Sequence, residues 1–157
     1  MRQAYRAHWG RIVGVWIVLA GVLWGLTQLW SCSPANASVM VETIAGEAAG
    51  ESFEGQVAVA EVIRNRADLG GWWGNTPEEV CLKRWQFSFW NDRWLASRWL
   101  GRNKGALEVA GRAWEASDGS NLTGGATHYY NPRLASPSWA SKLRNRVTIG
   151  NHVFGRV

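Results

Sequence analysis

The sequence predicts an α+β domain: a mainly helical lobe followed by a small antiparallel sheet, with one apolar helix ahead of both. Its 157 residues suit a single domain once a targeting segment is set aside. Up to about residue 116 apolar residues recur at helical spacing, whereas beyond Asp118 turn residues separate short β-prone runs. We therefore expect residues 1–37 to be a separate leader and residues 38–157 to form the folded domain.

The leader carries an apolar run, residues 12–30, after a flank that holds arginines and no acid. At roughly 1.5 Å per residue such a helix nearly spans a bilayer core of about 30 Å. The basic flank predicts a cytoplasmic N-terminus and an exported domain. Since Ala35-Asn36-Ala37 is typical of a cleavage site, the leader is either a cleaved signal peptide or a retained signal anchor in the membrane. Lipidation at Cys32 and slow release from the membrane are further alternatives.

Export limits the partners that we expect. The domain would work in the periplasm or cell envelope, secreted or anchored to the cytoplasmic membrane, where nucleic acid is not an expected partner. Residues 81–157 carry twelve Lys and Arg against four acids, without the dense run of a nucleic-acid arm. This basic half indicates an envelope polyanion or simply a solvated face.

The helical lobe has clear start and stop signals. Residues 38–50 read as a helix that Gly50 ends, and Ser52 is a good N-cap for a second helix from Phe53 to about residue 67. This second helix is apolar on several faces, which predicts a place in the core. Thr76, Pro77 and Glu79 predict a capping box for a short helix, and two more helices are expected at about 95–101 and 106–116.

The sheet is expected in the last third of the chain. A turn followed by a strand is predicted around residues 121–132, and a final strand pair over residues 146–156 turns at Gly150-Asn151.

Glu47 is the first candidate for chemistry. It ends the first helix, where the dipole and burial both favour the protonated form of a carboxyl, as a proton donor needs. In an unbroken helix Glu47, Glu51, Glu54 and Glu61 would share one charged stripe, which is usually a wet face. Gly50 argues against that continuity, but spacing alone leaves a solvent-facing Glu47 open.

Metal and nucleophile chemistry are poorly supported. His128 and His152 are the only histidines of the domain, and no H-E-x-x-H or C-x-x-C spacing occurs, so we expect no metal and no cofactor. Cys81 is expected to be a buried thiol. Eight tryptophans fall in residues 38–157, and those in loops (Trp72, Trp73 and Trp139) could present flat faces to sugar rings.

Four ordered motifs make the sequence similar to the SleB-type cell-wall hydrolases, the spore-cortex-lytic family. They are Ala45–Glu51 with Glu54–Arg66, then Gln86-Phe87-Ser88, then Thr123–Pro132, then Ile149–Phe154. The resemblance covers about residues 39–154. It implies a lysozyme-related, lytic-transglycosylase-like fold and cleavage of peptidoglycan between N-acetylmuramic acid (MurNAc) and N-acetylglucosamine (GlcNAc).

The family's catalytic acid falls on Glu47. The substrate-binding residues that the resemblance implies are Gln86, Phe87, Ser88, His128, Tyr129, Tyr130 and Asn131. A transglycosylase needs only one carboxyl because the muramic acid 6-hydroxyl is the nucleophile. Ala49 stands where many members carry Arg, so any Arg partner of Glu51 is missing here.

The expected function is therefore peptidoglycan degradation by a lytic transglycosylase, in cell-wall turnover or phage lysis. No peptidoglycan-binding repeat is visible, which argues against a spore role. Two alternatives stay open: a membrane-tethered module that binds peptidoglycan without cleaving it, and an N-acetylmuramoyl-L-alanine amidase, which would require zinc.

Overall fold

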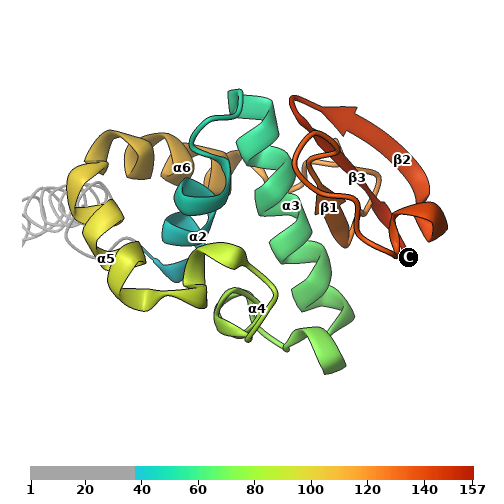
Figure 1. The fold of residues 1–157 in the computed structure, drawn as a ribbon, viewed down its shortest axis with the longest axis horizontal. Helices are drawn as coiled ribbons and strands as arrows, with labels where there is room; N and C mark the ends of the chain where they lie inside the picture. Colours follow the sequence, from blue (N-terminus) through green and yellow to red (C-terminus); the bar gives the residue numbers. More distant parts are fainter. Residues whose placement is uncertain (1–37) are drawn as a thin grey trace, which may run out of the picture. The chain divides into compact units, whose positions relative to one another are not determined.

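The computed structural model describes residues 38–157. The predicted apolar helix at 12–30 and the cleavage site lie outside these residues. Within them, no helix is both long enough and apolar enough to cross a membrane. The described part of the chain is mainly helical and ends in a three-stranded antiparallel sheet, which confirms the predicted fold class (Figure 1).

The first two helices meet at the predicted break. Helix α2 (Val39–Ala48) stops before Ala49 and Gly50, and α3 (Phe53–Leu69) begins after Ser52. The Ser52 hydroxyl accepts a hydrogen bond from the Gly55 amide at 3.2 Å, so the predicted N-cap is confirmed. The acids of this stretch therefore do not share one helix face.

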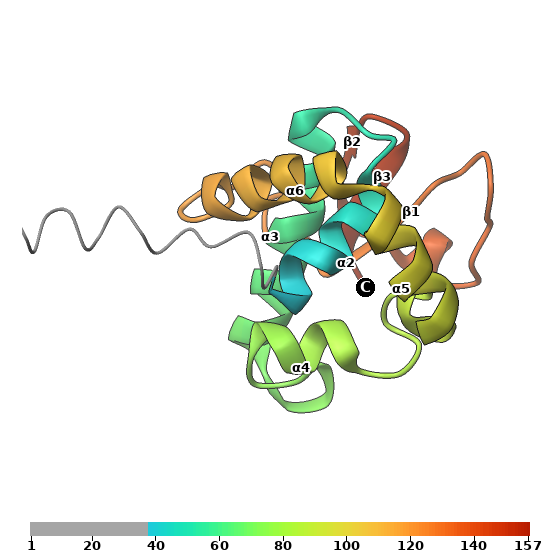
Figure 2. The same ribbon diagram turned by 90° about the vertical axis from the view of Figure 1, so that its left-hand side faces the viewer.

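Helix α3 is the centre of the core. It packs against α2, α4 and α6 and lies between the other helices and the sheet (Figures 1 and 2). Its apolar residues from Val57 to Ile63 are almost fully buried, as predicted. The other large core side chains are Ile44, Val80, Phe87 and Phe154.

The remaining helices begin close to their predicted positions. Helix α4 (Pro77–Leu82) is capped by the Thr76 hydroxyl, which accepts from the Glu79 amide at 3.2 Å. The predicted capping box is altered, because the Glu79 carboxylate accepts from the Asn75 amide at 2.7 Å instead of from Thr76. Helix α5 (Arg93–Arg102) starts earlier than expected because Asp92 caps it, and α6 (Lys104–Ala116) follows.

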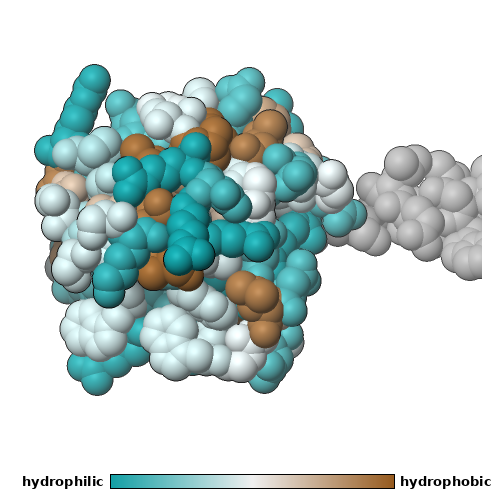
Figure 3. All heavy atoms as spheres, turned by 90° about the vertical axis from the view of Figure 1, so that its right-hand side faces the viewer, coloured by the Kyte–Doolittle hydropathy of each residue, from teal (hydrophilic) through white to brown (hydrophobic). Residues whose placement is uncertain are grey.

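The sheet has the order β1-β3-β2. Strand β1 (His128–Tyr130) pairs with β3 (His152–Arg156), which in turn pairs with β2 (Arg144–Ile149). The β2–β3 turn falls at Gly150-Asn151 as predicted. Hydrophilic side chains cross the face at this end of the domain (Figure 3).

Buried and half-buried polar side chains of α3 hold the segment that leads into the sheet. The Asn65 amide donates to the Ala126 carbonyl at 2.9 Å, and the Arg66 guanidinium donates to the Thr127 carbonyl at 2.8 Å. Glu61 is buried and accepts from Ser120 and from Thr123, among others. Glu61 is thus a structural residue rather than part of a wet face.

Candidate active site

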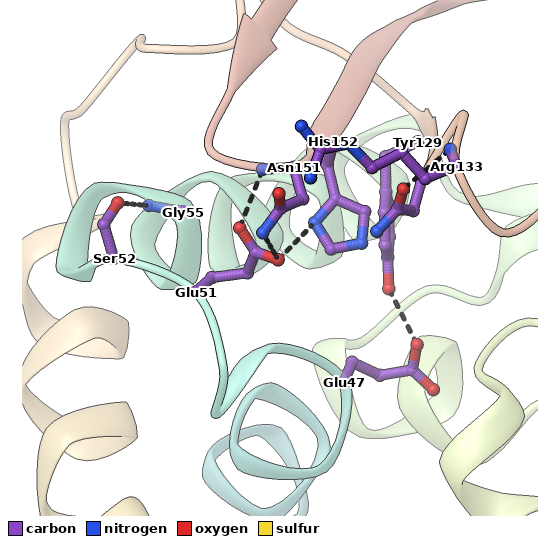
Figure 4. A network of polar contacts seen from close by, with 9 residues as sticks. Glu47, Glu51, Ser52, Gly55, Tyr129, Arg133, Asn151 and His152 are labelled. Carbon is purple, nitrogen blue, oxygen red and sulfur yellow. Dashed lines mark hydrogen bonds and ion pairs between the residues drawn. The ribbon is translucent and has the colours of Figure 1, made fainter.

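Glu47 lies in the last turn of α2 and is half-buried. Its Oε1 accepts hydrogen bonds from the Phe89 amide at 2.7 Å and from the Ser88 hydroxyl at 3.1 Å. Its Oε2 accepts from the Tyr129 hydroxyl at 3.1 Å (Figure 4). Three separate segments, the end of α2, the short 3₁₀ helix Ser88–Asn91 and strand β1, therefore fix one carboxyl group.

A cleft of about 560 Å³ opens over this carboxyl. Glu47 is the only acidic side chain that lines it within residues 38–157. The other lining residues are polar or aromatic for the most part: Arg66, Trp72, Trp73, Trp85, Gln86, Ser88, Asn91, His128, Tyr129, Tyr130, Asn131, Leu134, Ala135, Pro137, Trp139 and His152. A single carboxyl in an aromatic cleft suits acid–base chemistry on a sugar chain.

Tyr129 is held in its protonated form. Burial of the phenol raises its pKa well above the ordinary value, and the charge of Glu47 raises it further. The ring stacks on Phe154 of the neighbouring strand with 5.5 Å between ring centroids. Tyr129 is therefore a fixed hydrogen-bond donor to Glu47 and not a base.

Arg66 lies beneath the cleft and was not predicted as a site residue. It is 6% exposed, and its guanidinium lies over the rings of Trp73 at 4.7 Å and Phe87 at 5.1 Å. Burial lowers its pKa to about 10, so it remains charged at neutral pH. This charge also lowers the pKa of His128, after the larger effect of burial, and favours a neutral imidazole there.

Six of the seven predicted substrate-binding residues line the cleft, and Phe87 does not. Phe87 is 2% exposed, and its ring belongs to the core below Arg66. Its two neighbours in the sequence, Gln86 and Ser88, line the cleft instead. Gln86 has a double function: it lines the cleft and braces it, accepting from Arg66 at 3.3 Å and donating to the Trp73 carbonyl at 3.1 Å.

Exposed tryptophans stand at the cleft. Trp72 is 69% exposed and Trp85 is 70% exposed. Lys83 lies over one face of Trp72 at 4.9 Å and Arg84 over one face of Trp85 at 4.8 Å, so a sugar ring would stack on the opposite faces. Trp73 and Trp139 are half-buried and pack against the His128 ring. The sequence did not predict that Trp85 lines the cleft. The only available signal was its place in the aromatic run beside Gln86, since its positive φ of 69° is a feature of the folded loop.

Glu51 does not line the cleft but joins the helical lobe to the sheet. Its carboxylate accepts from the Asn151 amide at 2.9 Å and from the Asn151 side chain at 3.1 Å, and lies 3.5 Å from His152 (Figure 4). Burial alone would raise the pKa of Glu51, but the Asn151 hydrogen bonds and His152 lower it below its ordinary value. The β2–β3 turn thus orients Glu51, and Ala49 is exposed.

Cys81 is a fully buried thiol, as predicted. Burial raises its pKa to about 12, which leaves no thiolate at neutral pH. Within residues 38–157, no group of three or more His, Cys, Asp or Glu is arranged to hold a metal ion.

The sequence of this domain matches a known protein family. A family model described as Cell Wall Hydrolase matches residues 50–155, beginning three residues after Glu47. The spore cortex-lytic enzyme of Oceanobacillus iheyensis is 33% identical over 122 residues, which are 78% of this chain and 42% of that protein. That of Halalkalibacterium halodurans is 32% identical over 123 residues, 78% of this chain and 35% of that protein. The chain therefore spans less than half the length of these curated relatives.

Two solved structures share the fold. The catalytic domain of the Bacillus cereus SleB protein aligns with a TM-score of 0.57 and 30% identity, over 74% of this chain and 86% of that one. The catalytic domain of the germination-specific lytic transglycosylase SleB from Bacillus anthracis aligns with a TM-score of 0.59 and 28% identity. That alignment covers 80% of this chain and 98% of the other.

Proposed function

Because the chain belongs to the cell wall hydrolase family, we propose that it degrades peptidoglycan as a lytic transglycosylase, with Glu47 as its single catalytic carboxyl. The bond it cleaves is the MurNAc–GlcNAc glycosidic bond. The observation that supports this most is that Glu47 is the only acid lining the aromatic cleft in the described part of the chain. Two-carboxylate glycosidases place a second Asp or Glu roughly 5–10 Å from the first.

The first step is proton transfer from the Glu47 carboxyl to the glycosidic oxygen. The bond between C1 of MurNAc and that oxygen breaks, and the leaving sugar departs with its new hydroxyl. Positive charge develops at C1, where the carbonyl of the C2 acetamido group can stabilise it. The hydrogen bonds from Ser88 and from the Phe89 amide hold Glu47 in place for this step.

The second step uses the same residue as a base. The Glu47 carboxylate takes the proton of the MurNAc 6-hydroxyl, and O6 bonds to C1 to give a 1,6-anhydro ring. Tyr129 can donate to Oε2 while Glu47 is ionised, so the carboxylate that forms after the first step finds a donor already in position. The carboxyl regains its proton and the cycle closes without a second acid.

The cleft walls supply the sugar contacts. Trp72 and Trp85 offer exposed faces on which sugar rings can stack. Gln86, Ser88, His128, Tyr130 and Asn131 offer polar atoms along the same cleft.

Peptidoglycan is reached only if the domain is exported, so export by residues 1–37, with or without retention of 12–30 in the membrane, is part of this proposal. Cell-wall turnover and phage lysis are the settings that it fits.

The test is digestion of purified sacculi by the full chain and by Glu47→Gln. The variant should still unfold cooperatively, and it should lose about 10²–10⁴-fold or more in the rate of glycan release. Glu54→Gln is the matched control, because Glu54 is an exposed acid on α3 outside the cleft. Wild-type turnover by Glu47→Gln would contradict the proposal, and binding without release by the wild-type chain would favour a non-catalytic module.

A further inference from the structure

A second groove, of about 720 Å³, adjoins the catalytic cleft. The two share Ser88 and Asn91, and the groove also reaches Gly46, the residue before Glu47. Ser88 is itself a hydrogen-bond donor to Glu47. A substrate that lies across Glu47 therefore has access to the groove as well as to the cleft.

The groove differs from the cleft in charge. Arg98 and Arg102 of α5 line it, both are exposed, and neither forms an ion pair within residues 38–157. The Arg98 guanidinium lies 4.5 Å above the ring of Trp94, which restricts its motion. Among the described residues, Asp92 is the only acid in the lining, and its Oδ1 already accepts from two amides at the start of α5.

The apolar residues that line the groove are Phe89, Leu95, Ala96 and Trp99. The Phe89 and Trp99 rings meet edge to face, with 5.7 Å between their centroids, and both are half-buried. Phe89 occupies the space that a Cβ on Gly46 would need, so its ring packs directly against the turn of α2 that carries Glu47. The exposed faces that suit sugar stacking, those of Trp72 and Trp85, line the cleft instead.

One part of the proposed substrate fits a groove that is lined by apolar side chains and by two arginines without an ion-pair partner in the described residues. The glycan itself is neutral, whereas the lactyl group of each muramic acid carries a short peptide with aliphatic side chains and free carboxylates. Arginine can bind a carboxylate through two parallel hydrogen bonds, a bidentate geometry that lysine cannot form. We propose that the groove binds the peptide stem of a muramic acid residue, with Arg98 and Arg102 pairing with its carboxylates. This inference rests on the proposed function, since it assumes a glycan strand lying over Glu47.

Binding measurements test the peptide subsite separately from catalysis. The full-length chain carrying Glu47→Gln, solubilised in detergent, would be titrated with soluble peptidoglycan strands and with the same strands after an amidase has removed their peptides. We expect the peptide-bearing strands to bind about tenfold more tightly, as expected for charge-assisted hydrogen bonds that are partly screened by solvent. Adding Arg98→Gln and Arg102→Gln should abolish that tenfold difference and leave binding of the stripped strands unchanged.

Arg112→Gln is the matched control, since Arg112 is an exposed arginine of α6 outside both the groove and the cleft. It should keep the tenfold difference. Equal affinity of the starting chain for both kinds of strand would overturn the inference, as would a difference that survives the double substitution. If the double variant is unfolded, the two affinities are measured for Arg98→Gln and Arg102→Gln separately. Each single variant should then reduce the preference for peptide-bearing strands. A failure of the proposed function would show instead as a wild-type chain that releases no glycan.

Discussion

At the scale of single residues, the position of Glu47 depends on donors from distant parts of the chain. Oε1 is held by the segment that begins at Ser88, and Oε2 by Tyr129 on the first strand. In all three hydrogen bonds Glu47 is the acceptor. They orient the carboxyl group and do not use the proton that Glu47 donates to the glycosidic oxygen. Loss of one donor should therefore weaken catalysis without removing the acid.

Tyr129→Phe isolates one of these donors. The substitution removes the hydroxyl and keeps the ring that stacks on Phe154. We expect turnover to fall about tenfold, because a hydrogen bond to a charged group contributes roughly 1.5–3 kcal/mol and two donors to Oε1 remain. The measurement is the initial rate of glycan release from sacculi, with the melting temperature as the control for folding. An unchanged rate in a folded variant would mean that Tyr129 does not orient Glu47.

At the scale of structural elements, two carboxylates join the helical lobe to the segments around the sheet. Glu51, at the corner between α2 and α3, holds the β2–β3 turn through Asn151. Gly150 in that turn has a φ of 58°, and a side chain there would collide with the Glu51 carboxylate. Glu61, inside α3, holds residues 120–123 through the amides of Leu122 and Thr123 and through two hydroxyls.

Glu61→Gln should destabilise the fold and flatten its acid dependence. Burial raises the pKa of Glu61, but its four hydrogen bonds outweigh burial and leave the pKa below the ordinary value. The unfolded chain then binds a proton more readily than the folded one, so the stability that Glu61 contributes is present above about pH 4.5 and is lost as pH falls through the folded-state pKa. The Gln side chain also has an NH₂ group, which cannot accept hydrogen bonds from the donors around it. The substitution should therefore lower the free energy of unfolding by about 2–3 kcal/mol at neutral pH.

Urea unfolding at a series of pH values measures both effects. The variant should be less stable than the wild-type chain at neutral pH. The difference in their free energies of unfolding should become smaller below about pH 4.5. Glu54→Gln, which changes an exposed acid on the same helix, should show neither effect. A gap that stays constant down to acidic pH would show that the Glu61 charge is not what stabilises this loop.

At the scale of the whole molecule, the parts predictable from the sequence were those with local signals. The break at Gly50, the caps at Ser52 and Thr76 and the turn at Gly150 each depend on a few adjacent residues, and the structure confirms them. The ordered motifs led to Glu47 and to most of the cleft. Neither backbone propensity nor spacing alone would have chosen Glu47 over Glu61.

The parts that the sequence did not predict depend on contacts between distant segments. Arg66 lies beneath the cleft only because α3 ends against the start of β1, and Glu51 finds its partner a hundred residues later at Asn151. Phe87 was misplaced because a motif gives the order of residues but not the direction of each side chain. The groove beside α5 requires Gly46, Ser88 and Arg102 to meet in space, which no local pattern encodes.

The central claim, that one carboxyl cleaves the glycan without a water nucleophile, has a direct test in the products. Sacculi would be digested by the full chain in water enriched in ¹⁸O, and the released muropeptides examined by mass spectrometry. An intramolecular attack by O6 predicts 1,6-anhydro-muramyl ends that are one water lighter than reducing ends and contain no ¹⁸O. Reducing ends that carry one ¹⁸O atom would contradict the account, because they would show that water, and not the 6-hydroxyl, attacks C1.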